Sequence, residues 1–278
     1  MNFDQYKSLG VINRTPDSFS DKGHSLNQKH FEEQLTSFLA DKSVICDFGF
    51  ESTAPMNSFV PLDEEVARFR DFLDASRDYN FQGRMVSFDT YKPQSFLMMS
   101  EMFGALHDDA RLIFNDVSGV LDDKLKAALL TFKGKKFAYI YTFSHIPSRQ
   151  QVQDHMKFLD ESKDIIAQTA DAFHKAYNWF KEFGMEEQLL FDAGFGFSKT
   201  YEQNWELINR YSELEGELLA RGLKNPHVIG LSKKSFLKKA LNTTDPVALE
   251  ELHKKLIQKI QSEAKLKLLF RVHDPKIL

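Results

Sequence analysis

Short runs of apolar residues alternate along the chain with longer stretches in which apolar residues recur at helical spacing. Continuous apolar runs are typical of parallel strands that are buried on both faces. Eight such runs cover residues 9–12, 44–46, 85–88, 112–114, 137–141, 189–191, 228–231 and 268–270. Helical periodicity marks segments 63–79, 122–132, 154–183 and 246–264, with Asp122 and Asp154 as expected N-caps.

The order of these elements predicts the fold. Strands that alternate with helices favour an α/β protein, and eight strands close a (β/α)₈ TIM barrel. The length of 278 residues fits one barrel and no Pro/Gly/Ser-rich linker divides the chain, so we expect a single domain over residues 1–278. Because only residues 274–278 follow the last run, we expect the barrel to lack a regular eighth helix.

Composition and charge narrow the classes of function. With 42% hydrophobic and 27% charged residues the chain is globular, and its net charge of −4 argues against nucleic acid or a membrane surface as a partner. No stretch reaches the ~20 apolar residues of a membrane helix, and residues 1–5 lack the features of a signal peptide. We therefore expect a cytoplasmic protein. The single cysteine, Cys46, lies in an apolar run and is expected to be a buried thiol.

Polar residues follow almost every apolar run. In a barrel the carboxyl ends of the strands converge on one mouth, where the catalytic groups lie. Helix capping would explain any one of these residues, but the whole set indicates an active site. The set comprises Asn13, Asp47, Thr53, Asp89, Asn115, Asp192, Lys234, Arg271 and His273.

The residue types indicate two adjoining pockets. Two carboxylates and an amide, from Asp89, Asn115 and Asp192, suit the edge of an amino-oxo-pyrimidine ring. Lys234 is expected to donate to the ring carbonyl and to keep the acids ionised. A second group suits an anion, above all a phosphate with a divalent ion, and comprises Asn13, Thr53, Arg271 and His273.

Glycines and long loops add two features of the predicted mouth. Residues 194–196, Gly-Phe-Gly, allow a sharp turn after Asp192 that leaves Phe197 free to lie over a flat ring. Loops 14–25 and 50–61 are long for a barrel with short connections, and such loops at a catalytic face are often lids.

These strand-end segments closely resemble the dihydropteroate synthase family, of which the chain is a divergent member. The matching segments occur in the family's order and span the chain from about Leu9 to Asp274: residues 13–21, 47–53, 87–91, 114–119, 191–200, 232–235 and 271–274. The resemblance implies a transferase of folate biosynthesis. Enzymes of this family join a pterin carrying a hydroxymethyl pyrophosphate to p-aminobenzoate and release pyrophosphate.

The resemblance also implies roles for individual residues. Asp89, Asn115, Asp192 and Lys234 would bind the pterin ring, with Phe197 and Thr53 beside it. Asn13 would hold Mg²⁺ on the pyrophosphate, whose oxygens Arg271 and His273 would bind.

The sequence departs from the family pattern at the mouth. Ala54 stands where the family loop usually has an arginine, and Phe50 replaces a glycine. Arg14, at a position usually small and aliphatic, is expected to supply the missing charge. The family's homodimer packs through late helices, so the expected absence of the last helix leaves dimerisation open.

Three functions are compatible with this pattern. The first is dihydropteroate synthase, which the retained pterin-binding positions favour. The second is a pterin-binding paralogue without synthase activity, to which Ala54 and the short C-terminal segment point. The third is another pterin-directed barrel, such as a methyltetrahydrofolate methyl-transfer domain, which would not need the anion pair Arg271 and His273.

Overall fold

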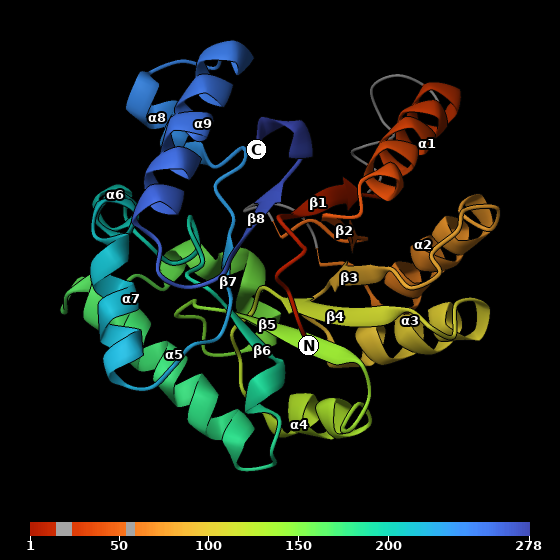
Figure 1. Cartoon of the computed structure of the whole chain (residues 1–278), viewed down its shortest axis with the longest axis horizontal. Helices are drawn as coiled ribbons and strands as arrows, with labels where there is room; N and C mark the ends of the chain where they lie inside the picture. Colours follow the sequence, from red (N-terminus) through yellow and green to blue (C-terminus); the bar gives the residue numbers. More distant parts are fainter. Residues whose placement is uncertain (15–23, 54–58) are drawn as a thin grey trace.

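Eight parallel strands close into a barrel in sequence order, as the sequence predicts (Figure 1). This computed structural model describes residues 1–14, 24–53 and 59–278. β8 pairs with β1 through three residue pairs, from Ser8–Phe270 to Gly10–Val272. The strands are β1 (Ser8–Asn13), β2 (Val44–Gly49), β3 (Met85–Asp89), β4 (Arg111–Asp116), β5 (Phe137–Thr142), β6 (Leu189–Asp192), β7 (His227–Ile229) and β8 (Leu268–Val272).

Helices surround the barrel and connect its strands (Figure 1). They are α1 (His24–Ala40), α2 (Leu62–Ala75), α3 (Pro93–Leu106), α4 (Asp123–Leu130), α5 (Ile165–Lys181), α6 (Tyr201–Asn209), α7 (Tyr211–Ala220), α8 (Ser235–Leu241) and α9 (Pro246–Glu263). Short 3₁₀ turns form η2 (Arg149–Lys157), η3 (Glu186–Gln188) and η4 (Pro275–Ile277). After β8 the described chain contains only η4, which agrees with the expected lack of a regular eighth helix.

The barrel interior contains an apolar layer to which every strand contributes. Leu9, Ile45, Ile113, Leu190 and Leu269 are among its members, and each is fully shielded from solvent. Because side chains alternate along a strand, the residue two positions further points to the same side. For four of these five residues the residue two positions further is polar: Asp47, Asn115, Asp192 and Arg271. Strand alternation thus places the polar residues directly above an apolar floor.

Phenylalanine dominates the layer between barrel and helices. The chain has 26 phenylalanines, many of them fully buried. Phe96 of α3 stacks on Phe114 of β4 with ring centroids 4.3 Å apart, and Phe173 of α5 stacks on Phe191 of β6 at the same distance. Such aromatic pairs bury large areas and favour a few geometries, so they fix the helices on the outer faces of the strands.

The start of one helix differs clearly from that predicted. Asp154 was expected to begin a helix over 154–183, and this prediction is wrong. Asp154 lies inside η2, and α5 begins eleven residues later, at Ile165. The Asp160 carboxylate accepts a hydrogen bond from Ser162 N at 2.8 Å, which forms a local turn, and Asp164 then caps α5 through Ile166 N and Ala167 N.

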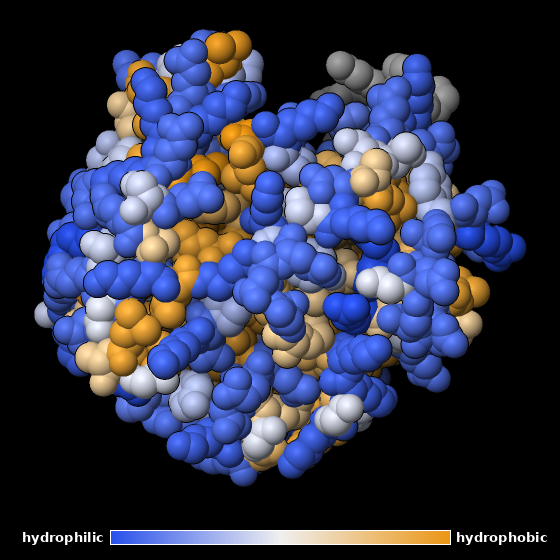
Figure 2. Space-filling model, viewed as in Figure 1, coloured by the Kyte–Doolittle hydropathy of each residue, from blue (hydrophilic) through white to orange (hydrophobic). Residues whose placement is uncertain are grey.

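Other local predictions are confirmed. Asp122 caps α4 by accepting from Leu125 N at 2.7 Å, and the Cys46 thiol is buried. In the described part of the chain no helix is both long and apolar enough to cross a membrane. The face in Figure 2 is mainly hydrophilic, with apolar residues gathered in the seam beside α8 and α9.

Candidate active site

A cavity of about 650 Å³ lies at the carboxyl ends of the strands. It reaches from the end of β3 to the segments that follow β6 and β7. Its lining includes five of the residues predicted for the site: Thr53, Asp89, Phe197, Lys234 and Arg271. The structure therefore brings two of the ring-binding candidates, Asp89 and Lys234, to one space with Arg271, whereas Asn115 and Asp192 are not among its lining residues.

Arg271 lies among carboxylates. Its Nε donates to Asp47 Oδ2 at 2.7 Å and its Nη2 donates to Asp89 Oδ2 at 2.5 Å. Asn115 Nδ2 donates to both oxygens of Asp47 at 3.3 Å. The sequence suggested a separate anion group that included Arg271, and in the structure this residue contacts the acids of the ring group directly. Without ligand, Arg271 is the cation that neutralises the acids at the barrel mouth.

Lys234 acts on the acids in the expected direction, but burial opposes its effect. Burial raises the pKa of Asp89 to about 7, against the opposing effects of Arg271 and Lys234. Burial also raises the pKa of Asp192, although Gly194 N and Lys234 oppose the shift. The pKa of Lys234 itself falls to about 8 because the ammonium is desolvated. Lys234 therefore does not keep Asp89 fully ionised near neutral pH.

The glycine turn after β6 has the predicted form. Gly194 N donates to Asp192 Oδ1 at 2.7 Å, which orients the carboxylate. Gly194 has a φ of +67°, and a Cβ atom there would come within 2.2 Å of the Phe143 carbonyl oxygen. Only glycine fits such a position. The turn therefore fixes Asp192 and begins the segment that leads to Phe197.

Phe197 forms an aromatic wall of the cavity. Lys234 Nζ lies 4.4 Å from the centroid of its ring, and the His155 ring lies 4.7 Å from it. Burial and the charges of Lys234 and Lys199 lower the pKa of His155 to about 4, so the imidazole is neutral at pH 7. Ser198 N donates to His155 Nδ1 at 3.3 Å, which leaves Nε2 to carry the ring proton.

Sequence reasoning missed His155, and it also missed Lys199. Lys199 Nζ is buried and donates to three carbonyl oxygens, those of Phe143, Gly194 and Phe197, at 2.9–3.2 Å. It ties the end of β5 to the glycine turn after β6. Its position beside that turn was a usable signal. For His155 there was none, because it reaches the cavity from η2 and follows no strand end.

Five predicted residues lie outside the cavity lining: Asn13, Arg14, Asn115, Asp192 and His273. Asn13 is exposed, and its side chain lies close against Gly49 at the end of β2. A Cβ atom at position 49 would come within 2.8 Å of Asn13 Oδ1. Arg14 Nη1 donates to Gln28 Oε1 at 3.3 Å, and the guanidinium lies over the Phe31 ring, so Arg14 packs on α1. His273 Nδ1 lies 2.9 Å from Ser232 Oγ. Most of the first predicted lid, loop 14–25, and the middle of the second, loop 50–61, lie outside the described residues, because residues 15–23 and 54–58 are not described. Ala54 lies in the second of these gaps.

His273 is neutral in this setting. Burial lowers its pKa to about 3, with contributions from Lys233, Arg271, His253 and Lys234. It can therefore offer an anion a neutral N–H donor, whereas Arg271 offers a full positive charge.

A closed barrel with buried acids, an amide, a lysine and an aromatic wall at its mouth is the arrangement of a barrel enzyme that recognises a flat, hydrogen-bonding ring. Residues 9–264 match the family described as pterin binding enzymes. The chain is 31% identical to a dihydropteroate synthase of Clostridium beijerinckii, over 84% of this chain and 77% of that protein. The chain therefore belongs to the dihydropteroate synthase family, as the sequence predicts.

Two further relatives agree with this assignment. A mitochondrial bifunctional folate synthesis protein of pea is 29% identical over 82% of this chain, which spans 43% of that protein's length. The structure of a dihydropteroate synthase from Clostridium difficile, determined in the presence of pteroic acid, superposes with a TM-score of 0.76 at 25% identity and covers 98% of this chain and 92% of that one. These comparisons confirm the predicted family and barrel fold, and they support the predicted transferase function.

Proposed function

We propose that the protein is a dihydropteroate synthase. It joins 6-hydroxymethyl-7,8-dihydropterin pyrophosphate to p-aminobenzoate and produces dihydropteroate and pyrophosphate, a step of folate biosynthesis in the cytoplasm. The observation that carries the proposal is the cavity at the barrel mouth, where Asp89, Lys234, Arg271 and Phe197 meet around a space of about 650 Å³. This volume lies within the range of small-molecule sites.

The pterin binds at the floor of this cavity. Asp192 is held by Gly194 N through one oxygen, so its other oxygen is available to the N–H groups of the ring. Asp89 and Asn115 complete the polar edge, and Lys234 donates to the ring carbonyl. Phe197 lies beside the ring face, and Thr53 also lines the cavity. The chemistry of these groups, which donate and accept at one edge, supports a pterin over a purely apolar ligand.

The reaction exchanges one bond at the pterin methylene carbon. The C–O bond to pyrophosphate breaks, the p-aminobenzoate nitrogen forms the new C–N bond, and that nitrogen loses a proton. Arg271 and the neutral N–H of His273 stabilise negative charge on the leaving pyrophosphate. For this, Arg271 must exchange part of its contact with Asp47 and Asp89 for phosphate oxygens.

Mg²⁺ is the proposed cofactor and Asn13 its protein ligand. In the described ranges no cluster of three or more His, Cys, Asp or Glu residues is able to hold a metal ion. Asn13 is exposed, and its amide oxygen is a ligand type that Mg²⁺ accepts together with water and phosphate oxygens. When bound, Mg²⁺ would neutralise charge on the pyrophosphate. Isothermal titration should show Mg²⁺ binding only with pyrophosphate present, and weaker in Asn13→Ala.

Arg14 is proposed to replace the charge of the loop arginine that Ala54 lacks. In the structure it packs on Phe31 and Gln28, so this role requires its guanidinium to turn towards the mouth. Arg14→Ala should then reduce turnover with p-aminobenzoate far more than pterin affinity. An unchanged kcat/KM would refute the role.

The decisive experiment measures pyrophosphate release with pterin pyrophosphate, p-aminobenzoate and Mg²⁺, in parallel with calorimetric binding of the pterin. We expect turnover that depends on all three components. Pterin binding without turnover would instead support a paralogue that has lost synthase activity. Absence of pterin binding would contradict the assigned ring pocket itself. A homodimer is compatible with the proposal but is not required by it, since every assigned residue comes from one chain.

A further inference from the structure

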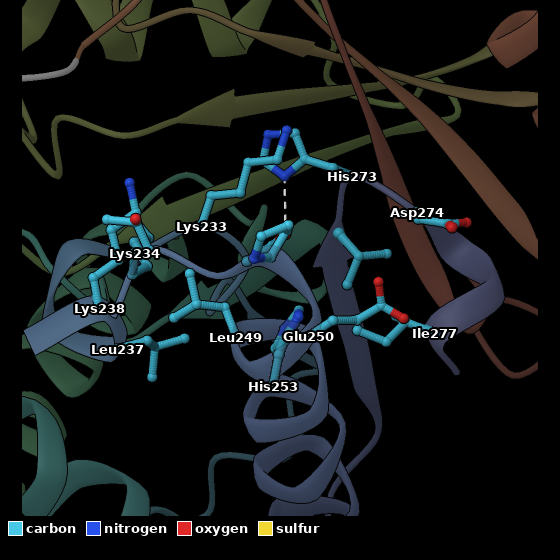
Figure 3. Close-up of a pocket in the computed structure, with 14 residues that line it drawn as sticks. Lys233, Lys234, Leu237, Lys238, Leu249, Glu250, His253, His273, Asp274 and Ile277 are labelled. Carbon is cyan, nitrogen blue, oxygen red and sulfur yellow. Dashed lines mark hydrogen bonds between the residues drawn. The ribbon is translucent and has the colours of Figure 1, made fainter. Parts of the chain in front are cut away.

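A second cavity, of about 350 Å³, adjoins the active site, with which it shares Lys233 and Lys234 (Figure 3). Its walls come from α8, α9 and the segment that leads from β8 into η4. Leu237, Leu249, Val272 and Ile277 form most of the apolar surface. Basic residues also line it: Lys233, Lys238, His253 and His273. No role in the proposed synthase reaction falls to Lys238, His253 or the apolar walls.

His253 is the buried polar residue of this cavity. It is only 6% exposed, and among the described residues neither of its ring nitrogens makes a hydrogen bond. Figure 3 shows its ring rising from α9 into the cavity. Desolvation lowers its pKa to about 4, so the neutral ring offers one N–H donor at pH 7. Because this donor has no protein partner and is not sealed from the cavity, a ligand there can accept its hydrogen bond.

The charges at the rim are unbalanced. Within the described part of the chain neither Lys233 nor Lys238 forms an ion pair, and the charge of Lys238 contributes, after burial, to a lowered pKa of Lys233. Three lysines, Lys233, Lys234 and Lys238, line the cavity against two acids, Glu250 and Asp274. Glu250 Oε1 is bonded to Lys254 Nζ at 2.7 Å, and Asp274 Oδ1 accepts from Lys276 N at 3.0 Å. The cavity therefore presents excess positive charge to a ligand.

We infer that this cavity is a second ligand site, which binds a small aromatic monocarboxylate. The carboxylate contacts Lys238 and Lys233 and accepts the N–H of His253, while the ring lies on Leu237, Leu249 and Ile277. A bare inorganic anion would leave the apolar walls unfilled, and an uncharged hydrocarbon would leave His253 and the lysines unpaired. The combination of both surfaces in 350 Å³ selects an anion with a flat apolar body.

Benzoate is the probe, because it lacks the amine needed for the proposed synthase reaction. The protein with isotope-labelled histidine rings is titrated with benzoate, and the His253 signal is assigned by its loss in His253→Gln. We expect a saturable shift of this signal. Since Lys233 and Lys234 line both cavities, the test variants change residues of the second cavity only.

Two variants locate the site and a third is the control. Lys238→Gln should weaken benzoate binding about tenfold, the effect of losing one charge-assisted hydrogen bond. Leu249→Trp should abolish the shift by filling the cavity. The control is Lys259→Gln. Lys259 lies on α9, as Leu249 does, and pairs with Glu263, so this variant should bind benzoate like the wild type. Circular dichroism confirms that each variant is folded.

Three results would overturn the inference. The first is the absence of a saturable His253 shift in the wild type. The second is wild-type affinity for benzoate in both Lys238→Gln and Leu249→Trp. The third is an affinity for inorganic phosphate equal to that for benzoate. The second would place benzoate in the active site, and the third would show that the apolar walls do not contribute. Because binding is measured directly, the outcome is independent of whether the protein catalyses the synthase reaction.

Discussion

At the scale of single residues, the active site is organised by how its charges are shared. Asp47 is completely buried and contacts Arg271 and Asn115, while Asp89, at the edge of the cavity, shares the same guanidinium. Asp192 stands apart, held by a backbone N–H. The acids therefore have different tasks. Asp47 positions Arg271 and Asn115, whereas Asp192 retains an oxygen for the ligand.

The first prediction concerns Asp192. Asp192→Asn replaces a carboxylate that accepts from the pterin by an amide that presents its own donor to the ring. Pterin affinity should fall by about 1.5–3 kcal/mol, the range for hydrogen bonds to charged groups. Calorimetry with a pterin measures this. The exposed Asp171→Asn on α5 is the control, and equal affinities in the two variants would mean that Asp192 does not hold the ring.

The second prediction concerns pH. Burial raises the pKa of Asp89 to about 7, so lowering the pH through this value protonates a group that must accept hydrogen bonds from the ring. Pterin affinity should therefore decrease towards acid pH, approaching about tenfold per unit below the pKa. Binding measured between about pH 8 and pH 5 tests this. Asp89→Asn should bind weakly with no acid limb, and an acid limb that persists in this variant would assign it to another group.

At the scale of elements, η2 is fixed to the barrel by one arginine. Arg149 is 8% exposed and donates from Nη1 to Asp116 Oδ2 at 2.6 Å and to the Tyr91 carbonyl oxygen at 2.7 Å. Its Nε also donates to Asp122, the N-cap of α4. This residue thus joins the ends of β3 and β4 to the turn that carries His155 towards the cavity.

The third prediction follows from this network. Arg149→Met leaves the buried Asp116 without its cation, so the free energy of unfolding should fall by about 3 kcal/mol. Denaturant unfolding measures the change. Arg77→Met, which breaks an exposed pair with Asp74, should cost less than about 1 kcal/mol. Similar losses in both variants would show that the network around Arg149 contributes little.

The same elements show what the sequence was able to predict. Strand ends were predictable, because alternation along a strand fixes which residues share the face of the barrel interior. The start of α5 was not, because Asp154, Asp160 and Asp164 are all suitable caps and the turn at Ser162 decides between them. His155 also escaped prediction. It reaches the cavity by the packing of η2 against the segment after β6, and no local pattern encodes such a contact.

At the scale of the whole molecule, one closed sheet supports every part of the site. The apolar floor of the barrel includes residues from β1 to β8. Unfolding of any one strand would therefore expose the apolar layer beneath the polar groups. The predicted single domain should accordingly unfold as one unit.

The fourth prediction tests this unity. Both tryptophans, Trp179 and Trp205, lie on α5 and α6, so their fluorescence reports on one side of the barrel, whereas far-ultraviolet circular dichroism reports on all helices and strands. The two denaturant transitions should coincide, as in a two-state protein. A fluorescence midpoint clearly separated from that of circular dichroism would divide the chain into independent units.

The ion pairs of Arg271 with Asp47 and Asp89 have a consequence for inhibitor design. Because the protein already supplies the counter-ion, an inhibitor with an amidine or amine near Asp89 would compete with an arginine that belongs to the barrel itself. A neutral heterocycle with adjacent N–H groups avoids that competition and can leave the arginine in place. Compounds that also carry a phosphate isostere would draw the guanidinium away from its acids. Their affinity would then depend on ionic strength, which gives a simple way to sort screening hits by the position they occupy.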